Sequence, residues 1–377
     1  MSNYRNMQYW LETLSEPPFI GLGETPGDPI FHAEGNVLIH TKMVLEELKK
    51  LPEFKDLNES DQLVLRLAAL FHDTGKQSCW VNIDGRISYA GHSRESNKIF
   101  YSYFWENGYN NITLEERRQV HGLIACHSWP PNLFNGTKVV KDYPPEAHVI
   151  HSSQYCRNDL LHLLSKADML GRTSKIDKKG SIAAVDLYRD LSKELNCLSA
   201  PYKFDNDHAR YKFLNDPNGN FNYQAFDDTK MVLHMMMGVP GSGKSTYRTK
   251  VLGSLPCISL DEIRIELGLP PGESTHRTLV PAYERFREIL REHKDCVWDA
   301  VNVRFDIRQQ VFSLARQYGA KTIIHFVDKD KEACHKGNKN REAKTPDYVV
   351  DGIAATMQMP KLSESHQFDW QQPTTKT

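Results

Sequence analysis

The chain has 377 residues, which is more than one hydrophobic core usually organises, so we expect two domains. Its 47 basic and 48 acidic residues give a net charge of -1, which excludes a broadly basic surface of the kind that coats long nucleic acids. The seven cysteines form no Cys-x-x-Cys pair, which argues against a disulfide framework and a thiolate zinc site and favours a reducing compartment.

The first residues, MSNYRNMQYW, lack the basic-then-apolar order of a signal peptide. No stretch approaches the about 18 consecutive apolar residues that a membrane-spanning helix needs. We therefore expect a soluble, cytoplasmic protein that has no membrane partner.

The N-terminal half has the pattern of a helical domain. Between residues 36 and 195 apolar residues recur at helical spacing, as in 36–49 and 61–73, and strand signals are few. The sequence therefore predicts a mostly helical first domain over residues 1–200.

A His-Asp pair stands out in this domain. His72 and Asp73 follow the apolar helix predicted over 63–71 and precede Thr74-Gly75-Lys76. A helix that stops there leaves two potential metal ligands side by side at its terminus.

The pair belongs to an ordered series of potential metal ligands: His40, His72, Asp73, His92, His127 and Asp168. Imidazole and carboxylate groups without thiolates suit Mn, Fe, Co, Ni or Zn, and a carboxylate can bridge two such ions. Two bridged ions bind a phosphate and generate hydroxide for in-line hydrolysis of a phosphoester. A single histidine more often caps a helix, stacks or faces solvent, so the adjacency and the order carry this prediction.

Over about residues 31–172 the series resembles the HD superfamily of metal-dependent phosphohydrolases, which has an all-helical fold. Flanking residues strengthen the resemblance, namely His32-Ala-Glu34-Gly35-Asn36 before His40, Lys76 after the doublet, and Ala167-Asp168-Met-Leu-Gly171-Arg172. It implies two divalent transition metals, such as Mn, Co, Ni, Zn or Fe, with Lys76 in support. The fourth histidine is open between His121 and His127, which cannot share one helical face. We favour His127, at the end of its helix.

The composition changes after residue 200. Between 201 and 228 Pro, Asn, Asp, Gly and isolated aromatics indicate loops and turns, so we predict a linker there and a second domain over 229–377. Beyond the linker, β-rich runs alternate with helical stretches such as 279–293, which is typical of a parallel α/β sheet. The runs are 231–237, 257–260, 296–298 and 322–327. The predicted fold class is therefore two-domain, α followed by α/β. We expect the last dozen residues, 366–377, to form a frayed tail.

The first β-rich run leads into Gly238-Val-Pro-Gly-Ser-Gly-Lys244-Ser245, followed by a predicted helix. Strand, glycine loop and helix in this order predict a phosphate-binding loop, or P-loop. Lys244 can reach the β- and γ-phosphates, and Ser245 offers a hydroxyl to Mg²⁺. We assign ATP or another NTP with Mg²⁺ to Gly238, Gly241, Ser242, Gly243, Lys244, Ser245 and Thr246.

The next strand end carries Asp261 and Arg264, one helical turn apart. The carboxylate can take the proton of an attacking hydroxyl, and the arginine can hold a phosphate on the acceptor. The alternative is a helix N-cap with an ion pair. Asp299 ends the following strand, either as an indirect Mg²⁺ ligand or as a cap. Farther on, Arg341 can neutralise the transferred phosphoryl group, against the alternative of a solvated helix end.

Over about residues 231–353 this half resembles the polynucleotide 5′-kinases, which move the γ-phosphate of a nucleoside triphosphate to a 5′-hydroxyl end. The resemblance implies that Asp261 is the general base, that Arg264 contacts the acceptor phosphate and that Arg341 acts from a lid. The family lid often has Arg-Asn-x-x-Arg and then Val-Pro. Here the lid is Gly337-Asn338-Lys339-Asn340-Arg341 with Thr345-Pro346, so one arginine is missing. Lys336 and Lys339 are the candidates to replace it, and Asn338 is a supporting residue.

Nearly the whole chain resembles bacterial end-healing enzymes in which an HD phosphatase is fused to a polynucleotide kinase. The resemblance implies RNA or DNA strand ends as substrates, a polynucleotide ligase as the downstream partner, and compatibility with a homodimer. The first domain would remove a 3′-phosphate, 2′-phosphate or 2′,3′-cyclic phosphate, and the second would phosphorylate the 5′-hydroxyl. Two alternatives remain: a small-molecule kinase fused to a nucleotide phosphohydrolase, which the incomplete lid favours, and a nucleotide-gated sensor without catalysis.

Overall fold

The structure is a computed structural model that describes residues 9, 12–109, 112–134, 143–175, 177–269, 275–341 and 344–372. The chain forms two compact units. Unit 1 comprises Met1–Tyr103, Asn110–Lys203 and Asn215–Tyr223, and unit 2 comprises Phe104–Tyr109, Phe204–Leu214 and Gln224–Thr377. The sequence-based boundaries at 200 and 229 stay a prediction. The segment between them contains helix α11 (Asp207–Asn215).

Unit 1 is helix-rich, as the sequence predicts, with one addition, an exposed antiparallel hairpin of β1 and β2. Its elements in chain order are η1 (Ile20–Gly23), α2 (Val37–Lys50), α3 (Pro52–Lys55), α4 (Glu59–Phe71), α5 (Lys76–Cys79), β1 (Val81–Ile83), β2 (Arg86–Ser88), α6 (His92–Asn107), α7 (Leu114–Cys126), η2 (Pro130–Asn132), α8 (Pro145–Ser153), α9 (Asn158–Leu170) and α10 (Lys179–Glu194). The last turn of α6 belongs to unit 2.

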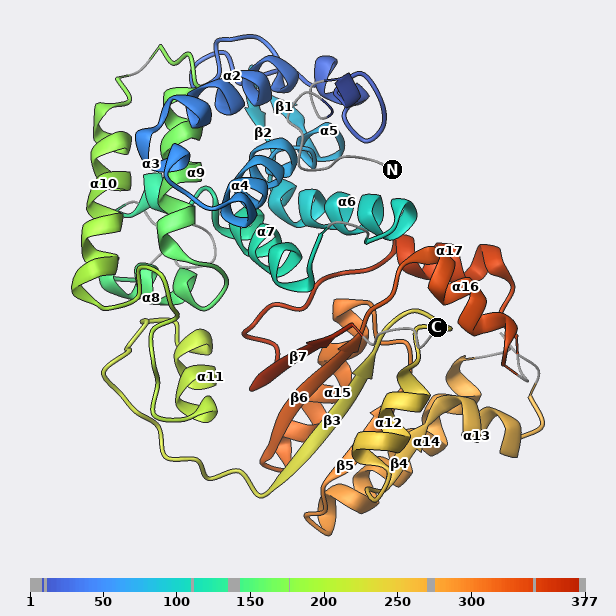
Figure 1. The fold of residues 1–377 in the computed structure, drawn as a ribbon. Helices are drawn as coiled ribbons and strands as arrows, with labels where there is room; N and C mark the ends of the chain where they lie inside the picture. The colour runs from blue at the N-terminus through green and yellow to red at the C-terminus, as the bar shows by residue number, and fades with distance from the viewer. Residues whose placement is uncertain are drawn as a thin grey trace. The chain divides into compact units, whose positions relative to one another are not determined.

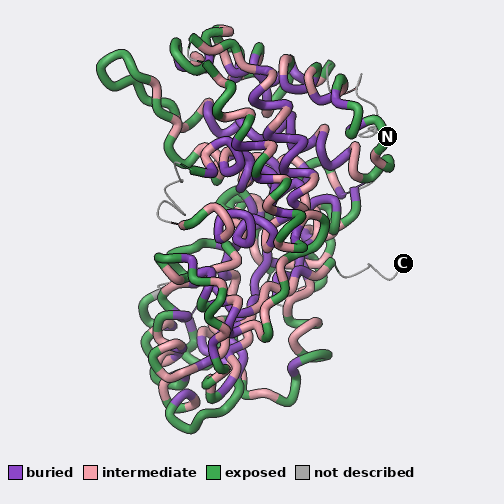
Figure 2. The backbone as a smooth tube through the Cα atoms, turned by 90° about the vertical axis from the view of Figure 1, so that its left-hand side faces the viewer, coloured by how far each residue is buried: buried purple, intermediate pink, exposed green. Residues whose placement is uncertain are grey.

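Helix α4 forms the centre of this unit. The Asn58 side chain accepts from the Asp61 N–H and fixes where α4 begins. From Leu63 onward nearly every side chain is buried, and α4 packs against α2, α7 and α9. A helix that is apolar all round requires neighbours on every side, so the end of α4 lies inside the bundle. Figure 2 shows the buried backbone in the interior and exposed segments around it.

Unit 2 is an α/β domain (Figure 1). Its remaining elements are β3 (Met231–Met237), α12 (Lys244–Leu252), β4 (Cys257–Ser259), α13 (Leu260–Glu266), α14 (Thr275–Arg291), β5 (Cys296–Asp299), α15 (Phe305–Gln317), β6 (Ala320–Val327), α16 (Lys331–Lys339), α17 (Asp347–Ala355) and β7 (Gln367–Gln371). The sheet is parallel, in the order β4-β5-β3-β6-β7. This confirms the predicted fold class.

The strand order places β3 at the centre of the sheet, between β5 and β6. Strands β4 and β5 follow β3 on one side, and β6 and β7 lie on the other. The carboxyl end of β3 is therefore the switch point at which open α/β sheets bind ligands.

The expected C-terminal tail is wrong for residues 367–371. They form β7, which pairs with β6 from Ile323↔Gln367 to Val327↔Gln371. Residues 373–377 lie outside the described residues. Among the described helices, none combines the length and the apolar character needed to span a lipid bilayer.

Candidate active sites

The structure brings all six predicted metal ligands of unit 1 together around the end of α4. His72 is the C-cap of α4, and Asp73 follows it. The other ligands come from the elements that pack around this point: His40 from α2, His92 from the start of α6, His127 from the C-cap of α7, and Asp168 from α9.

Asp73 lies at the centre, with one carboxylate oxygen toward each half of the set. Its Oδ2 lies 3.3 Å from His72 Nε2 and 3.6 Å from His40 Nε2. Its Oδ1 lies 3.5 Å from His92 Nε2 and 3.8 Å from His127 Nε2. Asp168 Oδ1 completes the first half, 3.0 Å from His40 Nε2. A carboxylate with this placement is suited to bridging two ions.

The rings are oriented as metal-binding imidazoles are. His72 Nδ1 faces Ala69 O at 2.9 Å, and His92 Nδ1 faces Tyr89 O at 2.9 Å. His127 Nδ1 faces Ile124 O at 2.8 Å. Since a carbonyl accepts only from a protonated nitrogen, each ring carries its proton on Nδ1. The Nε2 lone pairs therefore face Asp73.

Two further observations fit the same use. His72 Nε2 and Asp73 Oδ1 are buried and have no hydrogen bond of acceptable geometry among the described residues. Burial also lowers the pKa of His127 to about 3, which keeps this imidazole neutral, as a ligand must be. Three groups of these side chains have ligand atoms close enough to hold an ion: His40, His72 and Asp73; Asp73, His92 and His127; and His32, Glu34 and His40.

Cations surround the acidic centre. Lys76 Nζ lies 2.6 Å from Asp73 Oδ2, and Arg172 makes a two-pronged ion pair with Asp168, with Nη2 at 2.5 Å from Oδ2. Burial alone would raise the pKa of Asp73, but the positive charge of Lys76 beside it holds that pKa well below its usual range. The carboxylate is therefore ionised and ready to bind a cation.

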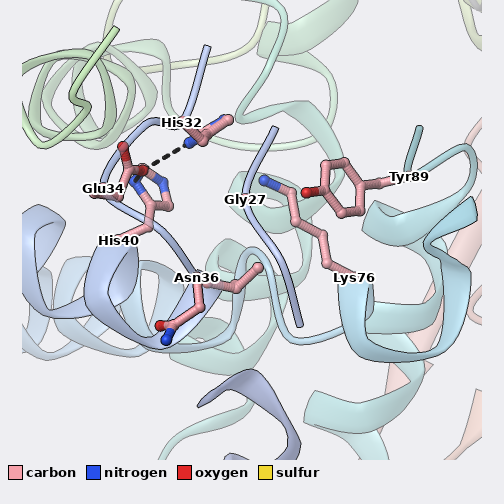
Figure 3. A pocket seen from close by; sticks show the side chains of 8 residues that line it. Gly27, His32, Glu34, Asn36, His40, Lys76 and Tyr89 are labelled. Carbon is pink, nitrogen blue, oxygen red and sulfur yellow. Dashed lines mark hydrogen bonds and ion pairs between the residues drawn. The ribbon is translucent and has the colours of Figure 1, made fainter. Parts of the chain in front are cut away.

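The pattern around residue 34 anchors His40. Glu34 Oε1 accepts from His32 Nδ1 at 2.9 Å and lies 3.1 Å from His40 Nδ1. The three side chains line a small pocket opposite Lys76 and Tyr89 (Figure 3). The His-Ala-Glu run is visible in the sequence, but its pattern predicts no role for Glu34 or Tyr89. The signal in the sequence that could indicate a role for Glu34 is its position between His32 and His40.

His121 does not join the cluster. Its Nδ1 lies 2.7 Å from Asn97 Oδ1, its ring packs edge-on against Phe100, and burial lowers its pKa to about 3. Of the two histidines that the sequence left open, the structure places His127 beside Asp73.

In unit 2, the predicted P-loop has a backbone that only glycine adopts easily. The φ angles of Gly238, Gly241 and Gly243 are 146°, 83° and 102°. Lys244 begins α12 directly after the loop, and its Nζ donates to Gly238 O at 2.8 Å and Val239 O at 3.1 Å. Burial lowers the pKa of this lysine.

The hydroxyl groups of the loop differ in exposure. Ser242 is buried, and its Oγ has no hydrogen-bond partner among the described residues. Ser245 and Thr246 are exposed in the first turn of α12. A nucleotide triphosphate with Mg²⁺ would supply partners for both kinds of hydroxyl.

Three predicted residues from two separate segments of unit 2 meet in one ion-pair cluster. Ser259 ends β4 and N-caps α13, so that Asp261 and Arg264 lie on the first turns of that helix. Arg264 Nη1 lies 2.5 Å from Asp261 Oδ1, and Arg341 Nη2 lies 3.3 Å from Asp261 Oδ2. The ion pair that the sequence offered as an alternative therefore exists, within a larger cluster that includes Arg341.

Asp299 ends β5 next to β3, and its Oδ2 lies 3.6 Å from Arg248 Nε. Burial raises the pKa of Asp299, against the opposing charge of Lys244.

In the predicted lid segment, the buried Asn338 donates to Thr345 O at 2.6 Å and accepts from Thr345 N at 3.1 Å. This pair of bonds closes the loop that carries Arg341. Lys336 and Lys339 are exposed on α16.

Comparisons with known proteins match this unit. The AAA_33 family model, described as an AAA domain, matches residues 233–360. A gluconokinase from Sinorhizobium meliloti 1021 is similar at 17% identity over 37% of this chain and 81% of that chain, with a TM-score of 0.27. No curated protein matches this chain. Residues 233–360 include the P-loop and its neighbouring strands, so unit 2 contains a P-loop kinase-like domain.

Proposed function

We propose that this chain heals nucleic-acid ends with two activities. The kinase domain would phosphorylate a 5′-hydroxyl end, and unit 1 would remove a 3′-phosphate, 2′-phosphate or 2′,3′-cyclic phosphate. The observation that carries this proposal is the presence in one chain of Asp261 between two arginines of the P-loop domain and of five further potential metal ligands gathered around Asp73. The products are the ends that a polynucleotide ligase joins.

In the kinase, Lys244 would bind the β- and γ-phosphates of ATP, and Ser245 would hold Mg²⁺, which would offset the charge of the phosphates. Asp261 would accept the proton of the 5′-hydroxyl. In the structure its carboxylate is paired with Arg264 and Arg341. An acceptor phosphate and the transferred phosphoryl group would draw the two arginines away and leave Asp261 free to act as a base.

In unit 1, the residues present fit two divalent cations. One would be held by His40, His72, Asp73 and Asp168, and the other by His92, His127 and Asp73. When bound, such a pair polarises a phosphate ester and supplies hydroxide. Lys76 and Arg172 hold positive charge beside Asp73 and Asp168, where they could bind phosphate oxygens.

The test uses an RNA strand with 5′-hydroxyl and 2′,3′-cyclic phosphate ends. The strand is incubated with ATP, Mg²⁺ and either Mn²⁺, Co²⁺, Ni²⁺ or Zn²⁺, and both ends are mapped. We expect a 5′-phosphate and loss of the cyclic phosphate. A DNA strand with a 3′-phosphate tests the sugar preference. If neither strand changes at either end, the proposal is wrong.

A small-molecule kinase is the second candidate, because the lid lacks an arginine at position 337. Labelled ATP offered with an equal concentration of 5′-hydroxyl oligonucleotide or free nucleoside separates the two. Label in the nucleoside alone would favour the metabolic function.

A further inference from the structure

The geometry around Gly337 explains why the lid has no arginine at this position. Helix α16 packs directly on the P-loop, and a Cβ on Gly337 would overlap the carbonyl oxygen of Gly241. In return, a Cβ on Gly241 would overlap Cys334 O and lie 2.7 Å from Asn338 N. A side chain at position 337 would therefore force α16 away from the loop. A cation that takes the place of an arginine at position 337 would have to come from another residue.

Lys329 supplies a positive charge at the P-loop. It lies two residues beyond β6, which pairs with β3 up to Met237↔Phe326, so the end of β6 adjoins the start of the loop. The Nζ of Lys329 lies 3.9 Å from the point where a Cβ on Gly243 would be. Gly243 is the residue directly before Lys244.

The residues on both sides of Lys329 are anchored elsewhere. The buried Asp328 accepts from the Tyr109 hydroxyl at 2.7 Å and from Trp370 Nε1 at 3.0 Å. Asp330 N-caps α16 by accepting from Ala333 N at 3.0 Å. The backbone of Lys329 is therefore held in place, while neither neighbouring carboxylate forms an ion pair with its ammonium group.

The ammonium group of Lys329 has no hydrogen bond or ion pair within the part of the chain that the structure describes. The side chain of Lys329 is half-buried, so its ammonium group has fewer positions open to it than that of a fully exposed lysine. A cation held beside glycine N–H groups and the N-terminus of α12 is placed to bind an anion, and a P-loop binds phosphates.

We propose that Lys329 binds the triphosphate of the donor nucleotide and replaces the lid arginine that position 337 cannot carry. The structure favours Lys329 over Lys336 and Lys339, both of which are exposed on α16. This inference rests on the proposed kinase activity. In that reaction the 5′-oxygen bonds to the γ-phosphorus and its proton passes to Asp261. The bond from the γ-phosphorus to the β,γ-bridging oxygen breaks, and ADP leaves with the electron pair. Lys329 would offset the charge on these phosphates.

The test measures ATP and ADP affinity by calorimetry in Lys329→Ala and Lys329→Arg, with Lys336→Ala and Lys339→Ala as matched controls. All carry the full chain, and melting curves show whether each variant is folded. We expect Lys329→Ala to weaken ATP binding about tenfold or more, and Lys329→Arg to retain it within about threefold. The two controls should stay within about twofold of the unchanged chain.

ATP binding and phosphoryl transfer are measured separately. A wrong role for Lys329 and a wrong polynucleotide substrate therefore give different results. If a folded Lys329→Ala binds ATP as tightly as the unchanged chain, or if Lys336→Ala loses as much affinity, Lys329 does not have this role, whatever the acceptor is. If Lys329→Ala loses affinity while the unchanged chain phosphorylates no oligonucleotide, the role of Lys329 stands and the polynucleotide substrate is wrong.

Discussion

Arg341 Nη2 lies 3.3 Å from Asp261 Oδ2, although the two residues are 80 positions apart in the chain. The other carboxylate oxygen pairs with Arg264. Asn338, which closes the lid loop onto Thr345, holds Arg341 near this point. The residues proposed as base, acceptor-binding arginine and lid arginine thus share one contact cluster. This cluster makes the role of Asp261 directly testable.

Asp261→Asn should abolish 5′-phosphorylation and leave phosphate release by unit 1 unchanged. The amide keeps the shape but cannot take the proton of a hydroxyl, and a positioned base contributes about 100-fold or more to rate. End-labelling of a 5′-hydroxyl strand measures the loss, and removal of a 3′-phosphate by the same preparation is the control. A folded variant that keeps its kinase rate would remove Asp261 from the role of base.

The end of a buried helix or strand could be predicted from the sequence because a run of apolar residues stops there and polar candidate site residues follow it. His72 and Asp73 end a buried helix, and Asp299 ends a buried strand, so each position followed from its run. Strand β7 was missed because Gln367–Gln371 has the polar composition of an exposed tail, and only its register with β6 makes it a strand. No pattern in the sequence points to Lys329, because its distance from the P-loop depends on the pairing of β6 with β3.

His92→Asn should abolish the hydrolase activity of unit 1 and spare the kinase. The ring of His92 is partly exposed, so its replacement should disturb folding less than replacement of the buried Asp73. Loss of Asp73 would also leave Lys76 without its partner. Metal content, measured by elemental analysis, should fall together with release of 3′-phosphate. Unchanged metal content and activity would show that His92 is not a ligand.

His127→Asn and His121→Asn form a matched pair on the same helical segment. His127 Nε2 lies 3.8 Å from Asp73 Oδ1, whereas His121 binds Asn97. We expect the first change to lower hydrolase activity about 100-fold or more, as loss of a ligand would. The second should act only through stability, which melting curves report. The reverse result would make His121 the fourth ligand.

Two histidines of unit 2, the buried His366 and the partly buried His234, should make its stability depend on pH. Burial lowers the pKa of His234 to about 4 and that of His366 to about 3, from 6.5. Because the unfolded chain binds protons more readily, the full stability is present above about pH 6.5 and falls as the pH drops toward 4. Each group contributes up to about 1.4 kcal/mol per pH unit in that range.

Urea unfolding at several pH values between about 4.5 and 7.5, followed by tryptophan fluorescence, measures this dependence. His234→Gln is the control, because a neutral amide at that position binds no proton in the unfolded chain. Its stability should change less with pH than that of the unchanged chain. An identical slope in both proteins would mean that the pKa of His234 is the same in the folded and unfolded chain, against this prediction.

Gly337→Ala tests the contact between α16 and the P-loop. Its Cβ would overlap Gly241 O, so α16 must shift, and the loop that it supports must shift with it. We expect ATP affinity to fall about tenfold and the free energy of unfolding to drop by about 1–3 kcal/mol, as overpacking usually costs.

Gly352→Ala is the matched control, since it lies in α17 of the same unit and its Cβ would meet no atom within 4 Å. Alanine favours a helix over glycine by about 0.5–1 kcal/mol, so this change should leave ATP affinity intact and raise the melting temperature slightly. Calorimetry and thermal melts on both variants decide the matter. If Gly337→Ala behaved like Gly352→Ala, the space at position 337 would have to be larger than the structure has it, and the charge of a lid arginine could be restored there.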